Sequence, residues 1–187
     1  MEIRDRNGLT EQEFLEAYAK KQYPRPYLTV DIILYAAKNR SILLIRRGGH
    51  PFLGRWALPG GFARNDETVE ESARRELLEE TGVEVSRLRP VGLFSRPGRD
   101  PRGWVISQAF LAITDDDVEA SAGDDANEAK WFAVTQEKKM LCLVNGDVHL
   151  EINMGSPQKS DLAFDHGEMI AEALKMTADY YERKTYE

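Results

Sequence analysis

A chain of 187 residues, 42% of them hydrophobic and 30% charged, is long enough for one globular domain with a sizeable core. Its formal net charge of −7 argues against general nucleic-acid binding, which requires a basic surface. No apolar run reaches the roughly 18–20 residues that span a bilayer, the first residues hold no apolar signal segment, and the single cysteine excludes an internal disulfide, so we expect a cytoplasmic protein with no membrane partner.

The first predicted element is a short helix over residues 10–20. Thr10 and Glu13 have the spacing of a capping box, in which each side chain accepts a hydrogen bond from the other residue's backbone N–H. One side of this helix would be apolar, and two prolines follow it and end it. We therefore predict that residues 1–26 form an N-terminal helical extension of a main domain at residues 27–187.

Two strands and a second helix are predicted next. LTVDIILY at 28–35 and SILLIR at 41–46 are rich in β-branched and apolar residues, which is typical of paired strands. The glycine- and proline-rich stretch RRGGHPFLGRWALPGG follows and is expected to be a loop. Thr68 begins a second capping-box pattern, and Gly82 stands where a left-handed C-terminal cap is expected, so the sequence predicts a helix over 68–81.

The rest of the chain predicts more strands and a last helix. The expected elements, in chain order, are strands at 91–95 and 105–113, a solvated acidic loop at 114–129, a strand at 130–134, a hairpin over 140–152 that turns at Asn145-Gly146, and a helix over 165–181. Because strands lie on both sides of the central helix in the sequence, we predict an α/β or α+β fold with a mixed sheet.

Three glutamates of the central helix share one face. Glu76, Glu79 and Glu80 are spaced i, i+3 and i+4, and like charges at such spacings cost roughly 0.2–0.5 kcal/mol per pair. A bound divalent cation removes that cost, and oxygen ligands favour Mg²⁺ or Mn²⁺ over zinc. Gly60 and Gly61 allow close backbone approach, so that a carbonyl there can be a further ligand. A solvated charged face, with no cation, is the alternative.

A longer pattern contains these residues. Gly61, five residues, Glu67, seven residues, then Arg75-Glu76-Leu77-x-Glu79-Glu80-x-Gly82-Val83 matches the pattern G-x5-E-x7-R-E-U-x-E-E-x-G-U at every fixed position. This pattern is the Nudix box, and the chain therefore resembles the Nudix hydrolases. The alternative of a solvated face loses its support.

The resemblance implies a fold and a chemistry. Nudix domains form an α/β/α sandwich around a mixed sheet and hydrolyse nucleoside diphosphates linked to another group, using Mg²⁺ or Mn²⁺. Carried over to this chain, Glu76 and Glu80 would be the main metal ligands, and the Gly60 carbonyl would complete the shell. Glu79 would be a further ligand, directly or through water, and Glu79 and Glu80 would both act in catalysis. Three residues would mainly support the loop and the helix: Gly61, Glu67 and Arg75.

The flanking segments narrow the substrate. YPRPYLTVD, WALPGGF and the run FSRPGRDPRGWVISQAFLA at 94–112 resemble ADP-ribose pyrophosphatase-type Nudix domains, with the closest likeness to those of NAD metabolism. The resemblance implies cleavage of ADP-ribose, or of a close relative, to AMP and a sugar phosphate. Arg96, Arg99 and Arg102 are predicted to contact the diphosphate or the terminal ribose, because arginine binds phosphate with two parallel hydrogen bonds. An ordinary surface turn is the alternative for this loop.

A general base is expected among the acidic residues after the box. Glu128 is preferred because it resembles an acidic position common in the family, and an ion pair with a lysine or arginine explains it equally well. His166 and Asp165, at the start of the last helix, are interpreted as structural. The other candidate bases are Asp115, Asp116, Asp117, Glu119, Asp124 and Asp125.

Two rival functions stay open at this point. Another Nudix substrate, such as a nucleoside triphosphate or a sugar nucleotide, would leave the box unchanged. A non-catalytic ADP-ribose sensor would have lost a box glutamate, and this chain has lost none. The resemblance also implies a homodimer, with a small-molecule nucleotide as the ligand. The net charge of −7 argues against a nucleic-acid partner.

Overall fold

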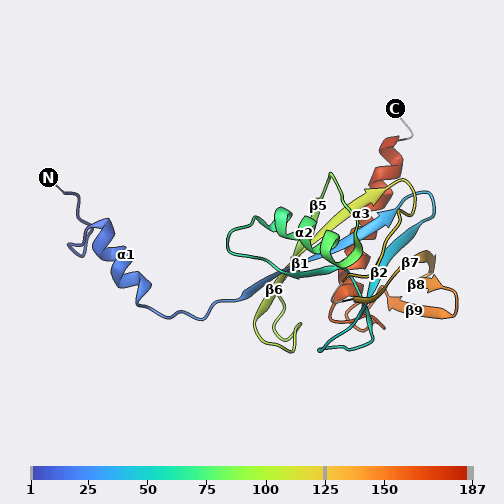
Figure 1. Cartoon of the computed structure of the whole chain (residues 1–187), viewed down its shortest axis with the longest axis horizontal. Helices are drawn as coiled ribbons and strands as arrows, with labels where there is room; N and C mark the ends of the chain where they lie inside the picture. Colours follow the sequence, from blue (N-terminus) through green and yellow to red (C-terminus); the bar gives the residue numbers. More distant parts are fainter. Residues whose placement is uncertain (1, 124–125, 185–187) are drawn as a thin grey trace.

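A single mixed sheet with a helix on each face forms the main body of the molecule (Figure 1). The computed structural model describes residues 2–123 and 126–184. The helices are α1 (Glu11–Ala19), α2 (Val69–Thr81) and α3 (His166–Lys184), and the strands are β1 (Tyr27–Ala36), β2 (Ser41–Arg47), β3 (Trp56–Ala57), β4 (Gly60–Phe62), β5 (Arg89–Phe94), β6 (Val105–Thr114), β7 (Ala126–Glu137), β8 (Met140–Asn145) and β9 (Val148–Asn153).

The order of strands places β1 at the centre of the site-bearing region. The sheet runs β5-β6-β1-β2-β7-β8-β9, with β3 paired to β2 and β4 paired to β1. β1 is parallel to β6 and antiparallel to β2 and β4, so the sheet is mixed, as predicted. The short strand β4 pairs with β1, and α2 contacts both of these strands.

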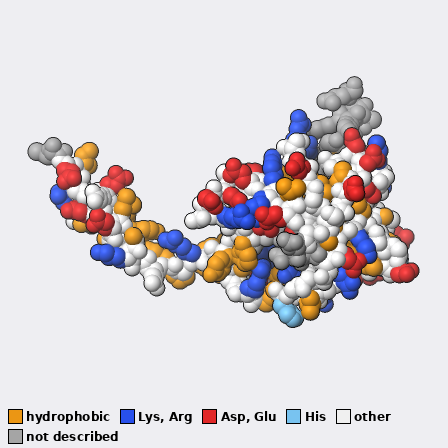
Figure 2. Space-filling model, in the orientation of Figure 1, with side chains coloured by type: hydrophobic (Ala, Val, Ile, Leu, Met, Phe, Trp, Pro, Cys, Tyr) orange, Lys and Arg blue, Asp and Glu red, His pale blue; other side chains and the backbone are white. Residues whose placement is uncertain are grey.

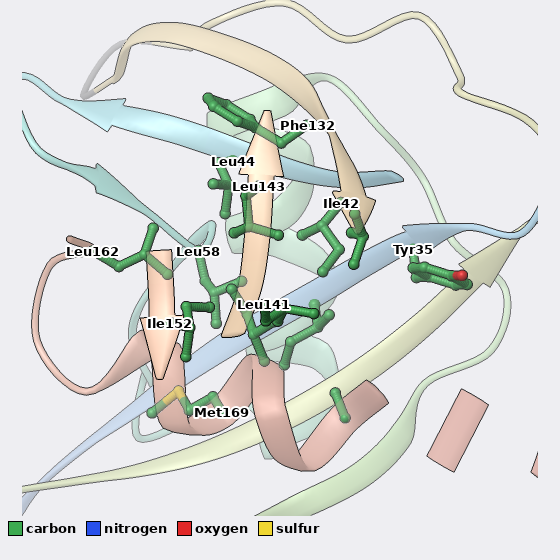
Figure 3. Packing of buried hydrophobic residues seen from close by; sticks show 14 of the residues in the cluster. Tyr35, Ile42, Leu44, Leu58, Phe132, Leu141, Leu143, Ile152, Leu162 and Met169 are labelled. Atoms are coloured by element: carbon green, nitrogen blue, oxygen red, sulfur yellow. The ribbon is translucent and has the colours of Figure 1, made fainter. Parts of the chain in front are cut away.

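Strand β1 also divides the hydrophobic core into two layers. Successive side chains point to opposite faces of a strand, and here Ile33 packs in the cluster that includes α3, whereas Ile32 packs in the cluster that includes α2. The larger, α3-side cluster is shown in Figure 3, where Met169 of α3 lies close to Ile152 of β9. Helices thus cover both faces of the sheet, and the predicted α/β/α sandwich is confirmed.

Helix α1 stands apart from this body on an extended segment (Figure 1). Its capping box between Thr10 and Glu13 is formed, but the helix buries none of its residues. Figure 2 shows hydrophobic side chains along this arm, where Phe14, Leu15 and Tyr18 are 45%, 55% and 43% exposed. The domain boundary at residue 26 stays a prediction. No helix in the described ranges is long and apolar enough to cross a membrane.

Two loop predictions were wrong in part. The glycine- and proline-rich stretch before α2 contains β3 and β4, because Ala57 and Leu58 are buried there and their backbone polar groups need partners. β7 begins at Ala126, inside the stretch predicted to be a solvated loop. Asp124 and Asp125 lie outside the described residues. The predicted hairpin is confirmed as β8 and β9, but it turns at Gly146-Asp147 and not at Asn145-Gly146, because Asn145 pairs with Val148.

Candidate functional site

Helix α2 is fixed at both ends and along one side. Thr68 accepts a hydrogen bond from the Glu71 N–H, and Gly82 ends the helix in the left-handed conformation, with φ 70°. Ala73 and Leu77 are fully buried in the core layer beneath this helix. These contacts set the rotation of the helix, so that its three glutamates face β4.

Two glycines of β4 bring the backbone against this acidic face. The Gly60 N–H donates to Glu80 Oε2 over 2.8 Å. A Cβ at Gly60 would lie 2.1 Å from the carbonyl oxygen of Val30, and a Cβ at Gly61 would lie 2.4 Å from Glu76 Oε2. A Cβ at Gly60 would push β4 away from the backbone of β1, whereas a Cβ at Gly61 would displace the end of the Glu76 side chain.

Arg75 connects the loop before the helix to the glutamate face. Its Nε donates to both carboxylate oxygens of Glu67, over 2.9 and 3.0 Å. Its Nη1 donates to Glu76 over 2.6 Å and to Glu79 over 3.0 Å, and its Nη2 donates to the Phe62 carbonyl over 3.1 Å. One guanidinium therefore holds three carboxylates and β4 together.

The glutamates differ in how well they are solvated. Burial raises the pKa of Glu80 to about 8, and the charge of Glu76 adds to this although the Gly60 N–H opposes it. Burial also raises the pKa of Glu76 in spite of its bond to Arg75. The side chain of Glu79 is 51% exposed. Glu76 and Glu80 are therefore the two carboxylates that are least solvated, and their ionised forms would be stabilised most by a bound cation.

The oxygen donors for a cation are engaged with other partners. Glu76 and Glu79 bind Arg75, and Glu80 accepts the Gly60 N–H. Across residues 2–123 and 126–184, no group of three or more His, Cys, Asp or Glu side chains is arranged as a metal site. The carboxylate oxygens suit Mg²⁺ by their chemistry, and Arg75 occupies only Oε1 of Glu76.

Two hollows adjoin this face. The acidic cleft has a volume of about 710 Å³, and its walls include the three glutamates together with Arg47, Arg64 and Arg102. The small cavity has a volume of about 50 Å³, and it lies between β1, β4 and the start of α3. Its walls include Asp31, Arg47, Gly60, Arg99, Arg102 and His166. The two hollows are adjacent, because both are lined by Arg47, Gly60, Gly61 and Arg102.

A buried polar cluster forms one wall of the small cavity. His166 Nδ1 accepts the Leu58 N–H over 2.8 Å, so the proton of the neutral ring is on Nε2. That nitrogen faces Asp31 Oδ1 at 3.3 Å, and Ser107 donates its hydroxyl proton to Asp31 Oδ2. His166 thus links α3 to Asp31 of β1 and to Leu58, which precedes β4. It has a structural role and also lines the small cavity.

The three arginines of the loop between β5 and β6 all bind carboxylates of the protein itself. Arg99 is buried and makes a bidentate pair with Asp165, with its Nη2 2.6 Å from Oδ1. Arg96 donates to Glu168 over 2.9 Å. Arg102 donates to Asp100 over 2.6 Å, and Arg99 and Arg102 also line the small cavity. Their contact with substrate stays a prediction.

Glu128 on β7 has two cationic neighbours. It accepts hydrogen bonds from Lys130 and from Arg46, the latter over 2.8 Å, and these two bonds lower its pKa. Its neighbour Asn127 lines the acidic cleft. Glu128 itself is held as a carboxylate by Arg46 and Lys130 and is not among the residues that line the cleft, and its role as a general base stays a prediction.

Sequence reasoning missed two residues of this site and interpreted a third as purely structural. Asp31 carried a usable signal, because a single acid inside the apolar run LTVDIILY is costly to bury without partners. Arg47 carried none, since it reads as one of several cations in a loop. The role of His166 depends on Leu58 and Asp31, which are far away in the sequence.

Comparison with known proteins places this geometry in context. A family model described as the NUDIX domain matches residues 25–149. The ADP-ribose pyrophosphatase of Methanocaldococcus jannaschii is 46% identical over 121 residues, which cover 63% of this chain and 68% of that protein. The ADPR responsive transcriptional repressor NtrR of Acinetobacter baylyi is 31% identical over 172 residues. That match covers 90% of this chain but only 61% of the repressor.

A solved structure shows the same architecture with a ligand. The NUDIX domain of Shewanella oneidensis NrtR, in a cocrystal structure with ADP ribose, superposes with a TM-score of 0.71 at 28% identity. The match covers 90% of this chain and 99% of that chain. The sandwich architecture of this chain is thus shared with a solved NUDIX domain.

Proposed function

The chain belongs to the Nudix family, and on that premise we propose that it is a Mg²⁺- or Mn²⁺-dependent hydrolase of ADP-ribose or a close relative. The products would be AMP and a sugar phosphate. The observation that carries the proposal is the acidic cleft, in which two poorly solvated glutamates face arginines across a space of about 710 Å³. A cation on the glutamates and a diphosphate beside the arginines would balance the charges of both walls.

The roles of individual residues follow from their positions. A divalent cation, when bound, would neutralise charge on the diphosphate and activate a water molecule. Glu76 and Glu80 would hold it, with Glu79 and the Gly60 carbonyl as further ligands. Arg75 and Glu67 would keep β4 against α2. Five other residues keep the roles expected from sequence: Gly61 in support of the box, Arg96, Arg99 and Arg102 toward the substrate, and Glu128 as the general base.

The substrate class is supported by two relatives. The M. jannaschii protein that is 46% identical to this chain is an ADP-ribose pyrophosphatase. The Shewanella NUDIX domain binds ADP ribose in its cocrystal structure. A small-molecule nucleotide also suits the net charge of −7 better than a nucleic acid does. A homodimer and a cytoplasmic location, both expected from sequence, complete the proposal.

The test is AMP release from ADP-ribose by the purified protein, with and without Mg²⁺. We expect turnover that chelation of the metal abolishes and that Glu80→Gln reduces by about 10²–10³-fold, the scale of losing one key electrostatic group. Glu84→Gln, at an exposed position just after the same helix, is the matched control and should retain full activity. Turnover of another nucleotide alone would refute the substrate, and full activity of Glu80→Gln would refute the ligand assignment.

A non-catalytic ADP-ribose sensor is the second candidate function. It is favoured by the 31% identity to a repressor described as responsive to ADPR. The complete set of box glutamates argues for catalysis instead. Calorimetry distinguishes the two, because a sensor would bind ADP-ribose tightly in the presence of Mg²⁺ and leave it intact.

A further inference from the structure

Two residues connect the short strands β3 and β4 and lead the chain into the acidic face. Leu58 and Pro59 form this link, and Gly60 follows as the first residue of β4. The Gly60 N–H donates to Glu80 Oε2 over 2.8 Å, and the Gly60 carbonyl is a further proposed ligand of the cation. Glycine has little conformational preference of its own, so the residues before Gly60 decide the direction of its N–H and of its carbonyl.

Each residue of this link is tied to another element by a hydrogen bond. Proline has no N–H, so Leu58 carries the only backbone donor of the link. Leu58 is 1% exposed, and its N–H donates to His166 Nδ1 over 2.8 Å. The Pro59 carbonyl accepts the Ile32 N–H over 2.9 Å. The link is therefore fixed to the backbone of β1 on one side and to one side chain of α3 on the other.

The imidazole of His166 is held so that Nδ1 faces the Leu58 N–H. The residue is 3% exposed, and its ring stacks on the Phe164 ring with 5.2 Å between the centroids. Nε2 lies 3.3 Å from Asp31 Oδ1, and Ser107 donates to the other oxygen of that carboxylate. A neutral imidazole carries one proton, and its place on Nε2 beside Asp31 leaves Nδ1 able to accept. These contacts fix both the orientation of the ring and its tautomer.

We propose that His166 is a positioning residue for the metal site, because its bond to the Leu58 N–H sets the direction of the Gly60 backbone. The inference rests on the proposed function, since it takes Glu80 and the Gly60 carbonyl as ligands of a divalent cation. His166 acts in this role through the backbone of the link and does not bind the cation itself. Where hydrogen-bonded partners of metal ligands are lost, the affinity for the metal falls by about 10–100-fold.

Two substitutions separate the two hydrogen bonds of the ring. Asparagine places its amide oxygen at the position of Nδ1, so His166→Asn keeps an acceptor for the Leu58 N–H and loses the contact with Asp31. Glutamine places its amide nitrogen at the position of Nε2, so His166→Gln keeps the contact with Asp31 and loses the acceptor. Because each variant loses one buried hydrogen bond, both should lower Tm by similar amounts. A purely structural role of His166 would therefore affect the two variants alike.

The test measures Mn²⁺ binding to the full chain by calorimetry, without nucleotide and below the Tm of each variant. For His166→Gln we expect an affinity for Mn²⁺ about 10–100-fold below that of the wild type. His166→Asn should bind Mn²⁺ several-fold more tightly than His166→Gln, in spite of its similar Tm. His149→Gln is the matched control, since His149 lies exposed on β9, and this variant should bind Mn²⁺ as the wild type does.

Several results would overturn the inference. They are equal Mn²⁺ affinities of His166→Asn and His166→Gln, wild-type affinity in His166→Gln, an equal loss in His149→Gln, or a His166→Gln chain that does not fold while His166→Asn does. A wild type that binds no Mn²⁺ would refute the ligand assignment together with the inference. A wild type that binds Mn²⁺ but does not hydrolyse ADP-ribose would refute the proposed hydrolase alone, and the difference between the two variants would still decide the role of His166.

Discussion

Replacement of Gly61 by alanine should damage the glutamate site while sparing the fold. The added Cβ would lie 2.4 Å from Glu76 Oε2, 2.6 Å from Cδ and 2.7 Å from Oε1. Ordinary van der Waals contact begins at 3.4 Å, so the Glu76 carboxylate must move by about 1.0 Å, the difference between 3.4 and 2.4 Å. The φ angle of Gly61 lies outside the left-handed region, so the backbone itself accepts alanine.

A shift of this size is expected to be costly for catalysis. A misplacement of about 1 Å can lower a rate by on the order of 10²-fold, or about 2.7 kcal/mol in the barrier. We therefore expect Gly61→Ala to lower kcat/KM for ADP-ribose about 100-fold and to raise the Mg²⁺ concentration needed for half-maximal activity. Because the clash is with the end of a flexible side chain, Tm should fall by less than about 3 °C. Initial rates of AMP release at several Mg²⁺ concentrations, with thermal unfolding, measure both effects.

Gly92→Ala is the control for this substitution. Gly92 lies on β5, its φ is also outside the left-handed region, and the nearest atom to its added Cβ is Phe94 Cε2 at 3.7 Å. Alanine there makes only ordinary contact, so activity and Mg²⁺ requirement should match the wild type. If Gly61→Ala showed the wild-type rate and Mg²⁺ requirement, or if Gly92→Ala lost as much activity, the placement of Glu76 in the site would be refuted.

The other predictions concern stability. Gly60→Ala should cost about 2–4 kcal/mol in chemical denaturation, because its φ of 154° and the Val30 carbonyl at 2.1 Å leave no room for a Cβ; an unchanged midpoint would contradict this. Arg99→Met should cost about 3–5 kcal/mol, since it leaves Asp165 buried without its bidentate partner, and adding Asp165→Asn should recover part of the loss. Removal of residues 1–22 should leave the Tm of the remaining domain unchanged, because α1 buries none of its residues. A lower Tm or a smaller oligomer after this truncation would instead indicate that α1 packs on a second copy.

The parts of this molecule that sequence predicts are those specified locally. Helix α2 could be placed within one residue because Thr68 and Gly82 signal its ends, and both caps depend on hydrogen bonds within a few positions. That the three glutamates share one face of α2 follows from their helical spacing alone. Apolar runs predict the strands but not their ends, because a strand extends only as far as it is hydrogen-bonded to a neighbouring strand.

The parts that sequence does not predict depend on distant partners. Arg99 and Asp165 are 66 positions apart, and the Leu58 N–H and His166 are 108 positions apart. No spacing rule connects them, so the sequence alone indicates only a structural role for Asp165 and His166. β3 and β4 were missed for the same reason, because each is defined by pairing with a longer strand rather than by its own residues.

The arginine loop shows why charge in a sequence is an incomplete guide to a binding site. Three arginines in seven residues suggest a phosphate-binding loop, yet each of them binds a carboxylate of the protein. Arg96 binds Glu168 in the first turn of α3, and Arg99 binds Asp165, the residue before that helix. Their first effect is thus to fix the loop to α3. His166 of α3 also contacts Asp31 of β1 and the Leu58 N–H between β3 and β4, so the loop and the start of β4 are both held by the first turn of α3. The guanidinium groups of Arg96 and Arg99 already donate hydrogen bonds to carboxylates of the protein, which leaves fewer N–H groups for a substrate. Arg47 instead lies over the Phe164 ring and donates its Nε–H to the Pro51 carbonyl.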